Sequence, residues 1–183
     1  MNLTVYCSAR EVDNENYKKA AKKLGEWIAA NNHSLVYGGS NTGLMKILAD
    51  AVLDGGAEVT GVELKLLDER GFTYDRIKNI KMCETLSERR SVMVALGDAF
   101  AALPGGLGTL DEISEVIELM SLKEKSLIKN GKAKSIIFFN IDGCYEQIKL
   151  FMERGVRDKL IEAEDYKNIH FLNGVDEMNG LFD

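Results

Sequence analysis

Short apolar runs alternate with segments of helical periodicity along the whole chain. Most of these runs have the length of a buried strand and are too short for a helix. They cover residues 3–7, 34–38, 57–62, 77–83, 99–103, 135–140 and 168–172. We therefore interpret them as strands and the segments between them as the helices that connect them.

The connecting segments place apolar residues three or four positions apart, which gives a helix one apolar face. The clearest stripes are Tyr17, Ala20, Ala21, Leu24 and Ile28; Leu44, Ile47, Leu48, Ala51 and Val52; and Ile113, Val116, Ile117 and Met120. Parallel neighbours need crossover connections, so buried strands linked by helices form mostly parallel sheets. We predict a Rossmann-like, doubly wound α/β fold with a mostly parallel sheet of about seven strands and helices on both faces. The length of 183 residues fits a single nucleotide-binding domain, residues 1–183.

Composition argues against several classes of function. Lys and Arg total 23 against 29 Asp and Glu, and the net charge of −6 removes the basic surface that general nucleic-acid binding needs. No apolar stretch approaches the roughly 18 residues of a membrane span, and no export signal is recognisable. Cys7, Cys83 and Cys144 form no CxxC pair and leave one thiol over in any disulfide scheme, so we expect reduced thiols and a cytoplasmic location.

The stretch "ALPGGLGTLDEI", residues 102–113, holds the chain's one proline and three glycines. It follows an apolar run and precedes a helical stripe, so it lies where doubly wound folds bind ligands. Peptide N–H groups that no side chain covers can converge on an anion there, and the Thr109 hydroxyl adds a donor. Walker A is excluded because no Lys-Ser/Thr pair follows the glycines. The loop is interpreted as a phosphate cradle of another kind, and a strained turn without a ligand is the alternative.

A second glycine loop, "VYGGSNTGLMK", places Gly38, Gly39 and Gly43 between a strand and a helix. Its amides and the helix N-terminus also suit a phosphate, although the spacing is not GxGxxG. Glu63 follows the next strand, as a ribose-binding acid would in a dinucleotide site. A plain tight turn is the alternative interpretation.

Charged residues beside these loops have two interpretations each. The first interpretation of Glu112 is a capping box with Thr109, in which the glutamate binds the backbone of the cap residue. The second interpretation is that Glu112 acts on a substrate. Arg89 and Arg90 begin a predicted helix, where the macrodipole is already positive, so an anion nearby would explain them. Solvated surface charge is the alternative for both arginines.

Together these motifs resemble the LOG ("Lonely guy") family of cytokinin-activating phosphoribohydrolases, whose members are often labelled lysine decarboxylases. "PGGLGTLDE" matches the family's PGGxGTxxE, "SERRSVMVALGDAFAALPGG" is similar to its arginine helix, and "YGGSNTGLM" is similar to YGGGxxGLM. The likeness extends from "VYCSAR" to "FFNIDGCYEQIKLFM", nearly the whole chain. It implies hydrolysis of the N-glycosidic bond of a nucleoside 5′-monophosphate, such as a cytokinin riboside monophosphate or AMP, to free base and ribose 5-phosphate.

The resemblance also implies site residues. Arg89 and Glu112 match the catalytic pair, and Arg90 stands where the family usually has Lys. The residues expected to bind substrate or phosphate are Ser8, Gly38, Gly39, Glu69, Arg90, Gly105, Gly106, Leu107, Gly108 and Thr109. No cofactor and no metal are expected, and the partners are a small-molecule nucleotide and a second copy of the chain in a homodimer.

The sequence departs from the family pattern at several positions. Ser40 and Lys46 replace glycines, Ala9 and Arg10 alter the first loop, and "EVIELMSLKEKS" lacks the family's Trp-x-Gln. These changes bear on base specificity more than on the reaction. One alternative function stays open, a nucleotide-binding module that senses its ligand without hydrolysis. A lysine decarboxylase lacks support, because the sequence offers no recognisable pyridoxal phosphate site.

Overall fold

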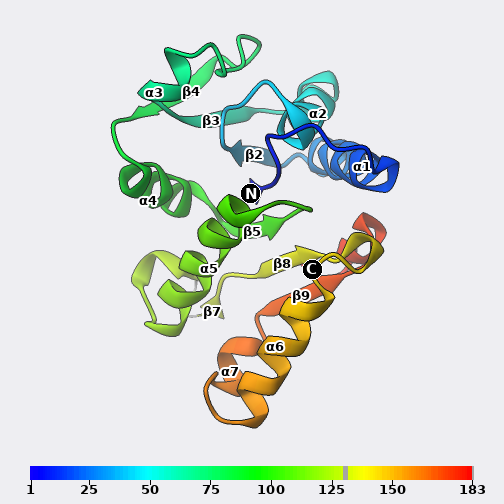
Figure 1. Cartoon of the computed structure of the whole chain (residues 1–183), viewed down its shortest axis with the longest axis vertical. Helices are drawn as coiled ribbons and strands as arrows, with labels where there is room; N and C mark the ends of the chain where they lie inside the picture. The colour runs from blue at the N-terminus through cyan, green and yellow to red at the C-terminus, as the bar shows by residue number, and fades with distance from the viewer. Residues whose placement is uncertain (130–131, 183) are drawn as a thin grey trace.

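A seven-stranded parallel sheet runs through the centre of the computed structural model, which describes residues 1–129 and 132–182 (Figure 1). Its strands lie in the order β4-β3-β2-β1-β5-β8-β9. They are β1 (Asn2–Tyr6), β2 (Ser34–Tyr37), β3 (Val59–Leu64), β4 (Asn79–Cys83), β5 (Ala99–Ala102), β8 (Ile136–Phe139) and β9 (Ile169–Leu172). Every pairing in this sheet is parallel. The predicted doubly wound α/β fold and its strand number are confirmed.

Helices cover both faces of the sheet, as its buried strands require. The longer ones are α1 (Glu15–Ala30), α2 (Gly43–Asp54), α4 (Leu86–Leu96), α5 (Leu107–Ser121) and α6 (Glu146–Arg157). Short helical turns are α3 (Lys65–Asp68), α7 (Ala163–Tyr166), η1 (Lys125–Leu127), η2 (Ile141–Gly143) and η3 (Val175–Met178). A small antiparallel pair, β6 (Ile128–Lys129) and β7 (Lys132–Ala133), lies between α5 and β8.

Strand β1 shows how the sheet builds two cores. Leu3 and Val5 point to the face covered by α1 and α2, and Tyr6 points to the face covered by α4 and α5. Thr4, also fully buried, donates its hydroxyl to the Met93 carbonyl of α4 at 3.2 Å. Successive side chains of a strand alternate between faces, so a strand covered on both sides is apolar at nearly every position.

Two strands differ from the sequence prediction by two residues at a boundary, and the other five differ by one residue. The apolar run at 57–62 becomes β3, Val59–Leu64, which takes Glu63 into the sheet at 0% exposure. The run at 77–83 becomes β4, an edge strand on which only Cys83 is buried. An edge strand has a neighbour on one side only, so the polar positions in this run are compatible with pairing.

The chain reverses direction across the sheet between β1 and β5. From β1 it winds outward through β2, β3 and β4, and it then returns to place β5 on the other side of β1. Loops that leave two such strands separate at their carboxyl ends and open a crevice, which is where doubly wound folds bind ligands. In this chain the two loops begin at Cys7 and Leu103, and the second contains the predicted phosphate cradle. No helix in the described part of the chain is long and apolar enough to cross a membrane.

Helices α1 and α2 cross at Gly25, where they make close backbone contact. A Cβ built on Gly25 would lie 2.7 Å from the Leu48 carbonyl oxygen and 2.6 Å from the Ala51 Cβ. Backbone atoms cannot move aside as the end of a long side chain can, so a methyl group here would force the two helices apart.

We therefore predict that Gly25→Ala lowers the free energy of unfolding by about 1–3 kcal/mol. This loss would come despite the gain of up to about 1 kcal/mol that alanine brings to a helix interior. Urea denaturation measures it. Gly174→Ala is the matched control, because a Cβ at Gly174 meets no atom within 4 Å. Equal stability of the two variants would contradict the packing argument.

Candidate active site

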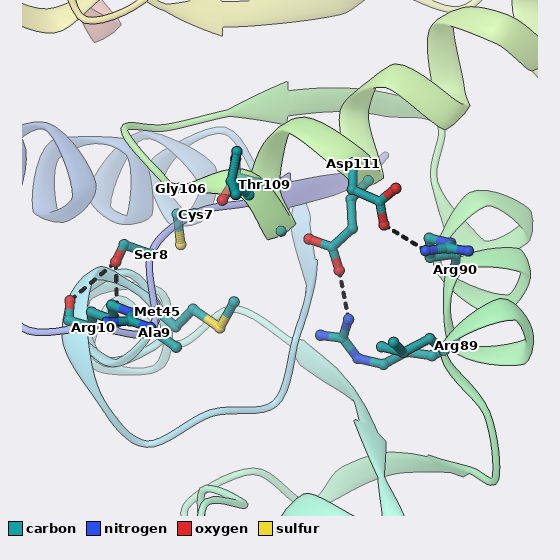
Figure 2. Close-up of a pocket in the computed structure, with 14 residues that line it drawn as sticks. Cys7, Ser8, Ala9, Arg10, Met45, Arg89, Arg90, Gly106, Thr109 and Asp111 are labelled. Atoms are coloured by element: carbon teal, nitrogen blue, oxygen red, sulfur yellow. Dashed lines mark hydrogen bonds and ion pairs between the residues drawn. The ribbon is translucent and has the colours of Figure 1, made fainter.

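A pocket of about 610 Å³ lies at this crevice, and its size suits a small-molecule ligand (Figure 2). The loop after β1 forms one wall, and Met45 of α2 lies beside it. The first residues of α5 form a second wall, and α4 contributes Leu86, Arg89 and Arg90. The site therefore combines both loops of the switch point with two helices from one face of the sheet.

The predicted phosphate cradle is the start of α5. The helix begins at Leu107 after the cap residue Gly106, and no side chain caps it. The first N–H groups of a helix lack partners within the helix, and the dipole adds about half a positive charge. Gly106, Leu107, Gly108 and Thr109 all line the pocket, so these donors are placed at its wall.

The capping-box interpretation of Thr109 and Glu112 is wrong. The cap residue is Gly106, so Thr109 lies inside the first turn of α5, where it is 4% exposed. Because the helix starts three residues earlier than that interpretation requires, Glu112 has no cap amide to accept from. Its side chain instead meets α4.

Two contacts from other segments hold the cradle in place. The Tyr145 hydroxyl donates to the Leu103 carbonyl at 2.7 Å, and the Ser8 amide donates to the Pro104 carbonyl at 3.3 Å. Tyr145 is itself positioned by its amide, which donates to Asn140 Oδ1 at 2.7 Å. In the sequence, only the family likeness distinguishes the segment around Tyr145. This hydroxyl connects η2 and α6 to the loop that begins the site.

Arg89 is buried at 7% exposure and joins four elements at the base of the pocket. Its Nε donates to the Val62 carbonyl of β3 at 2.7 Å, and its Nη2 donates to the Gly38 carbonyl at 3.3 Å. Its Nη1 donates to Glu112 Oε1 at 2.5 Å (Figure 2). A Cβ on Gly38 would lie 2.4 Å from Nη2, so the bare backbone there makes room for the guanidinium. The solvated-charge interpretation of Arg89 is wrong.

The Arg89–Glu112 pair is largely shielded from water, with side-chain exposures of 8% and 11%. Burial raises the pKa of Glu112 above its ordinary value, and the charge of Arg89 opposes that rise. A carboxylate so placed is oriented by a fixed hydrogen bond and is poorly hydrated, which strengthens its interaction with any positive charge that develops nearby.

Arg90 is engaged by two carboxylates of α5. Its Nη1 donates to Asp111 Oδ2 at 2.5 Å, and its Nε lies 2.6 Å from Glu115 Oε2 without hydrogen-bond alignment. Asp111 and Glu112 therefore face different arginines, as expected of adjacent helical residues that point about 100° apart. These pairs connect α4 to α5 along one side of the pocket.

The remaining predicted residues divide into two groups. Ser8 lines the pocket, as predicted. Gly38, Gly39, Gly105 and Glu69 lie outside the lining; Gly38 acts through Arg89, and Glu69 is exposed at the end of α3.

Glu63 does not face the pocket as a ribose-binding acid would. Its Oε1 accepts the Leu64 amide at 2.9 Å, and its Oε2 has no hydrogen-bond partner in the described structure. Burial raises the pKa of this carboxyl. Cys7, Met45 and Leu86 line the pocket without having been predicted, because apolar residues that form a ligand surface have the same sequence pattern as a core.

Solved structures share this fold. A molybdenum cofactor binding protein from Rippkaea orientalis superposes with a TM-score of 0.73 at 18% identity, over 99% of this chain and 94% of that one. A molybdenum cofactor carrier protein from Chlamydomonas reinhardtii gives a TM-score of 0.69, also at 18% identity, with the same coverage of each chain. At this level of identity the likeness establishes the fold alone.

Relatives found by sequence have a higher identity to this chain than these structures do. The probable cytokinin riboside 5′-monophosphate phosphoribohydrolase LOGL6 of rice (Oryza sativa subsp. japonica) is 35% identical over 87% of this chain and 61% of its own length. The cytokinin riboside 5′-monophosphate phosphoribohydrolase LOG1 of Arabidopsis thaliana is 34% identical over 87% of this chain and 71% of its own. The chain thus spans about two thirds of the length of these relatives.

The family model described as "Possible lysine decarboxylase" matches residues 45–180, which include α4, the cradle and Glu112. The matched range and the relatives agree with the motifs recognised in the sequence. The chain belongs to this family, which includes the cytokinin riboside 5′-monophosphate phosphoribohydrolases.

Proposed function

We propose that this protein hydrolyses the N-glycosidic bond of a nucleoside 5′-monophosphate, giving the free base and ribose 5-phosphate. The observation that carries the proposal is the oriented Arg89–Glu112 pair, which lines the same pocket as the uncapped start of α5. The helix end suits the phosphate of a phosphorylated sugar, and the fixed carboxylate suits the positive charge that develops at its anomeric carbon. The names of the relatives support cytokinin riboside monophosphates as substrates, and AMP is the second substrate that we propose.

In the proposed reaction the phosphate binds at the first turn of α5, and the ribose lies toward Glu112. Breaking the C1′–N bond builds positive charge on the ribose, which the Glu112 carboxylate stabilises. Glu112 also takes a proton from the attacking water, whose oxygen bonds to C1′, and this proton passes to the nitrogen of the departing base, which returns Glu112 to its carboxylate form. Arg89 acts as a positioning residue because its bonds to β2, β3 and Glu112 hold the carboxylate in one orientation. The distant phosphate positions the sugar, so its binding energy raises kcat/KM.

The family description suggests a decarboxylase, and the pocket can be tested for that chemistry. Enzymes of this type bind pyridoxal phosphate through a lysine Schiff base. The pocket lining contains three arginines and no lysine among the described residues. These residues do not fit that cofactor, and the proposed reaction does not use it.

We also propose that the protein works as a cytoplasmic homodimer, as the resemblance implies. Leu86 and Leu107 are 57% and 85% exposed at the mouth of the pocket. Large apolar side chains that stay exposed around one pocket are typical of surfaces that a ligand or another protein covers.

A substrate panel tests the proposed reaction. We predict that incubation with AMP or isopentenyladenosine monophosphate releases free adenine or free isopentenyladenine, measured by chromatography. Binding of the monophosphates without release of base from any purine or pyrimidine monophosphate would contradict hydrolysis. That result would instead favour the non-catalytic nucleotide-binding module.

Replacing the proposed catalytic carboxylate is a direct test of mechanism. We predict that Glu112→Gln lowers kcat by about 10²–10⁴-fold, because the amide neither carries negative charge nor takes a proton. Glu118→Gln is the matched control: it makes the same change on the same helix at an exposed position. Circular dichroism of both variants checks that they are folded. Wild-type turnover by a folded Glu112→Gln would refute the assigned role.

The pH profile should show the environment of Glu112. Burial raises the pKa of this carboxyl, and the reaction needs its ionised form. We therefore predict that kcat/KM falls on the acid side with an apparent pKa above about 4.3, the value of an unperturbed glutamate. Activity is present above this pKa and is lost as the pH falls through it. A profile that stays flat down to the ordinary glutamate range would contradict this prediction.

A further inference from the structure

Among the described residues, one of the arginines that line the pocket has no ion-pair partner. Three arginines line it, and Arg89 and Arg90 are each paired with carboxylates of α5. Arg10, the third, makes no ion pair with any residue that the structure describes, and its only hydrogen bonds are made by its backbone. A phosphate that enters this pocket therefore meets one uncompensated positive side chain.

Arg89 has little capacity left for a phosphate. Three of its five N–H groups already donate hydrogen bonds, to Val62, Gly38 and Glu112. Turning the guanidinium toward a ligand would leave a carbonyl and a carboxylate buried without partners, which is costly. The arginine that can turn toward the substrate phosphate without breaking such contacts is therefore on another element.

The loop that carries Arg10 is held firmly against α2. The Ala9 carbonyl accepts the Thr42 hydroxyl at 2.7 Å, and the Gly43 amide donates to Glu11 Oε1 at 3.1 Å. Gly43 has a φ of +59°, and a Cβ on it would lie 2.5 Å from the Arg10 carbonyl oxygen. The backbone of the loop is packed directly on the start of α2, so the base of the Arg10 side chain has a fixed position.

Within the loop, the Arg10 amide donates to Ser8 Oγ at 3.0 Å, and that hydroxyl donates to the Arg10 carbonyl at 3.2 Å. The Ser8 amide in turn donates to the Pro104 carbonyl, which places the loop beside the cradle. Figure 2 shows Arg10 and Ser8 across the pocket from Arg89 and Arg90, with Gly106 and Thr109 between the two sides. Arg10 thus lies on the side of the pocket away from the proposed catalytic pair.

We propose that Arg10 binds the 5′-phosphate of the substrate, together with the free amides at the start of α5. This inference rests on the proposed function and assigns the cation that makes the site prefer a phosphorylated sugar. A guanidinium forms charge-assisted hydrogen bonds to phosphate oxygens, and the helix end supplies further donors to the same group. Because Arg10 lies across the pocket from Arg89, which holds Glu112, it contributes to binding and to specificity and leaves the chemical step to the other side.

The experiment measures binding separately from turnover. Isothermal calorimetry gives the affinity of the wild type, Arg10→Ala, Arg10→Lys and the control Arg157→Ala for ribose 5-phosphate. Arg157 is exposed on α6 and its loss changes the net charge equally. We expect Arg10→Ala to weaken binding about tenfold, as loss of one charge-assisted contact does, with Arg10→Lys recovering most of it and Arg157→Ala changing nothing. With AMP as substrate, KM should rise by the same factor at nearly constant kcat.

Two outcomes separate this inference from the proposed function. If Arg10→Ala binds ribose 5-phosphate as tightly as the wild type, the role of Arg10 is overturned even when the wild type releases base. If the wild type binds ribose 5-phosphate and Arg10→Ala does not, yet no monophosphate is cleaved, the phosphate site stands and the proposed hydrolysis fails.

Discussion

The buried guanidinium of Arg89 connects the sheet to the site. It hydrogen-bonds a carbonyl of β3, the carbonyl of Gly38 after β2, and the Glu112 carboxylate of α5, while its own backbone belongs to α4. A charge at 7% exposure is tolerated only where its donors are satisfied and an opposite charge is close. The same contacts that compensate this charge fix the position of Glu112. The stability of the site and the orientation of its carboxylate therefore depend on one side chain.

The sequence was sufficient for the parts of the fold that depend on local patterns. Buried strands and helix stripes are recognisable because burial on both faces makes them apolar, and the glycine loop is recognisable because it follows a strand. The predicted capping box at the start of α5 is wrong, because Thr109 and Glu112 fit the sequence pattern of a capping box as well as they fit an interior turn. The partners of Arg89 could not be inferred locally, since they come from residues 23 to 51 positions away. The family likeness indicated that Arg89 and Glu112 matter, and the fold explains how they meet.

Proteins with this fold include a molybdenum cofactor binding protein at 18% identity, and a shared fold at this level of identity says little about the ligand. The switch point supplies a crevice and an electropositive helix end to any chain that folds this way. What distinguishes one chain from another is the set of side chains around that crevice. Here they are three arginines, two of them already paired with acids, and a carboxylate whose position is fixed.

The departures from the family pattern fall into two groups once they are placed in the structure. Ser40 and Lys46 do not line the pocket: the Ser40 hydroxyl meets Thr42, and Lys46 pairs with Asp50 along α2. Their effect on a ligand can only be indirect, through the position of α2. Arg10 does line the pocket, where an added cation acts directly on an anionic substrate.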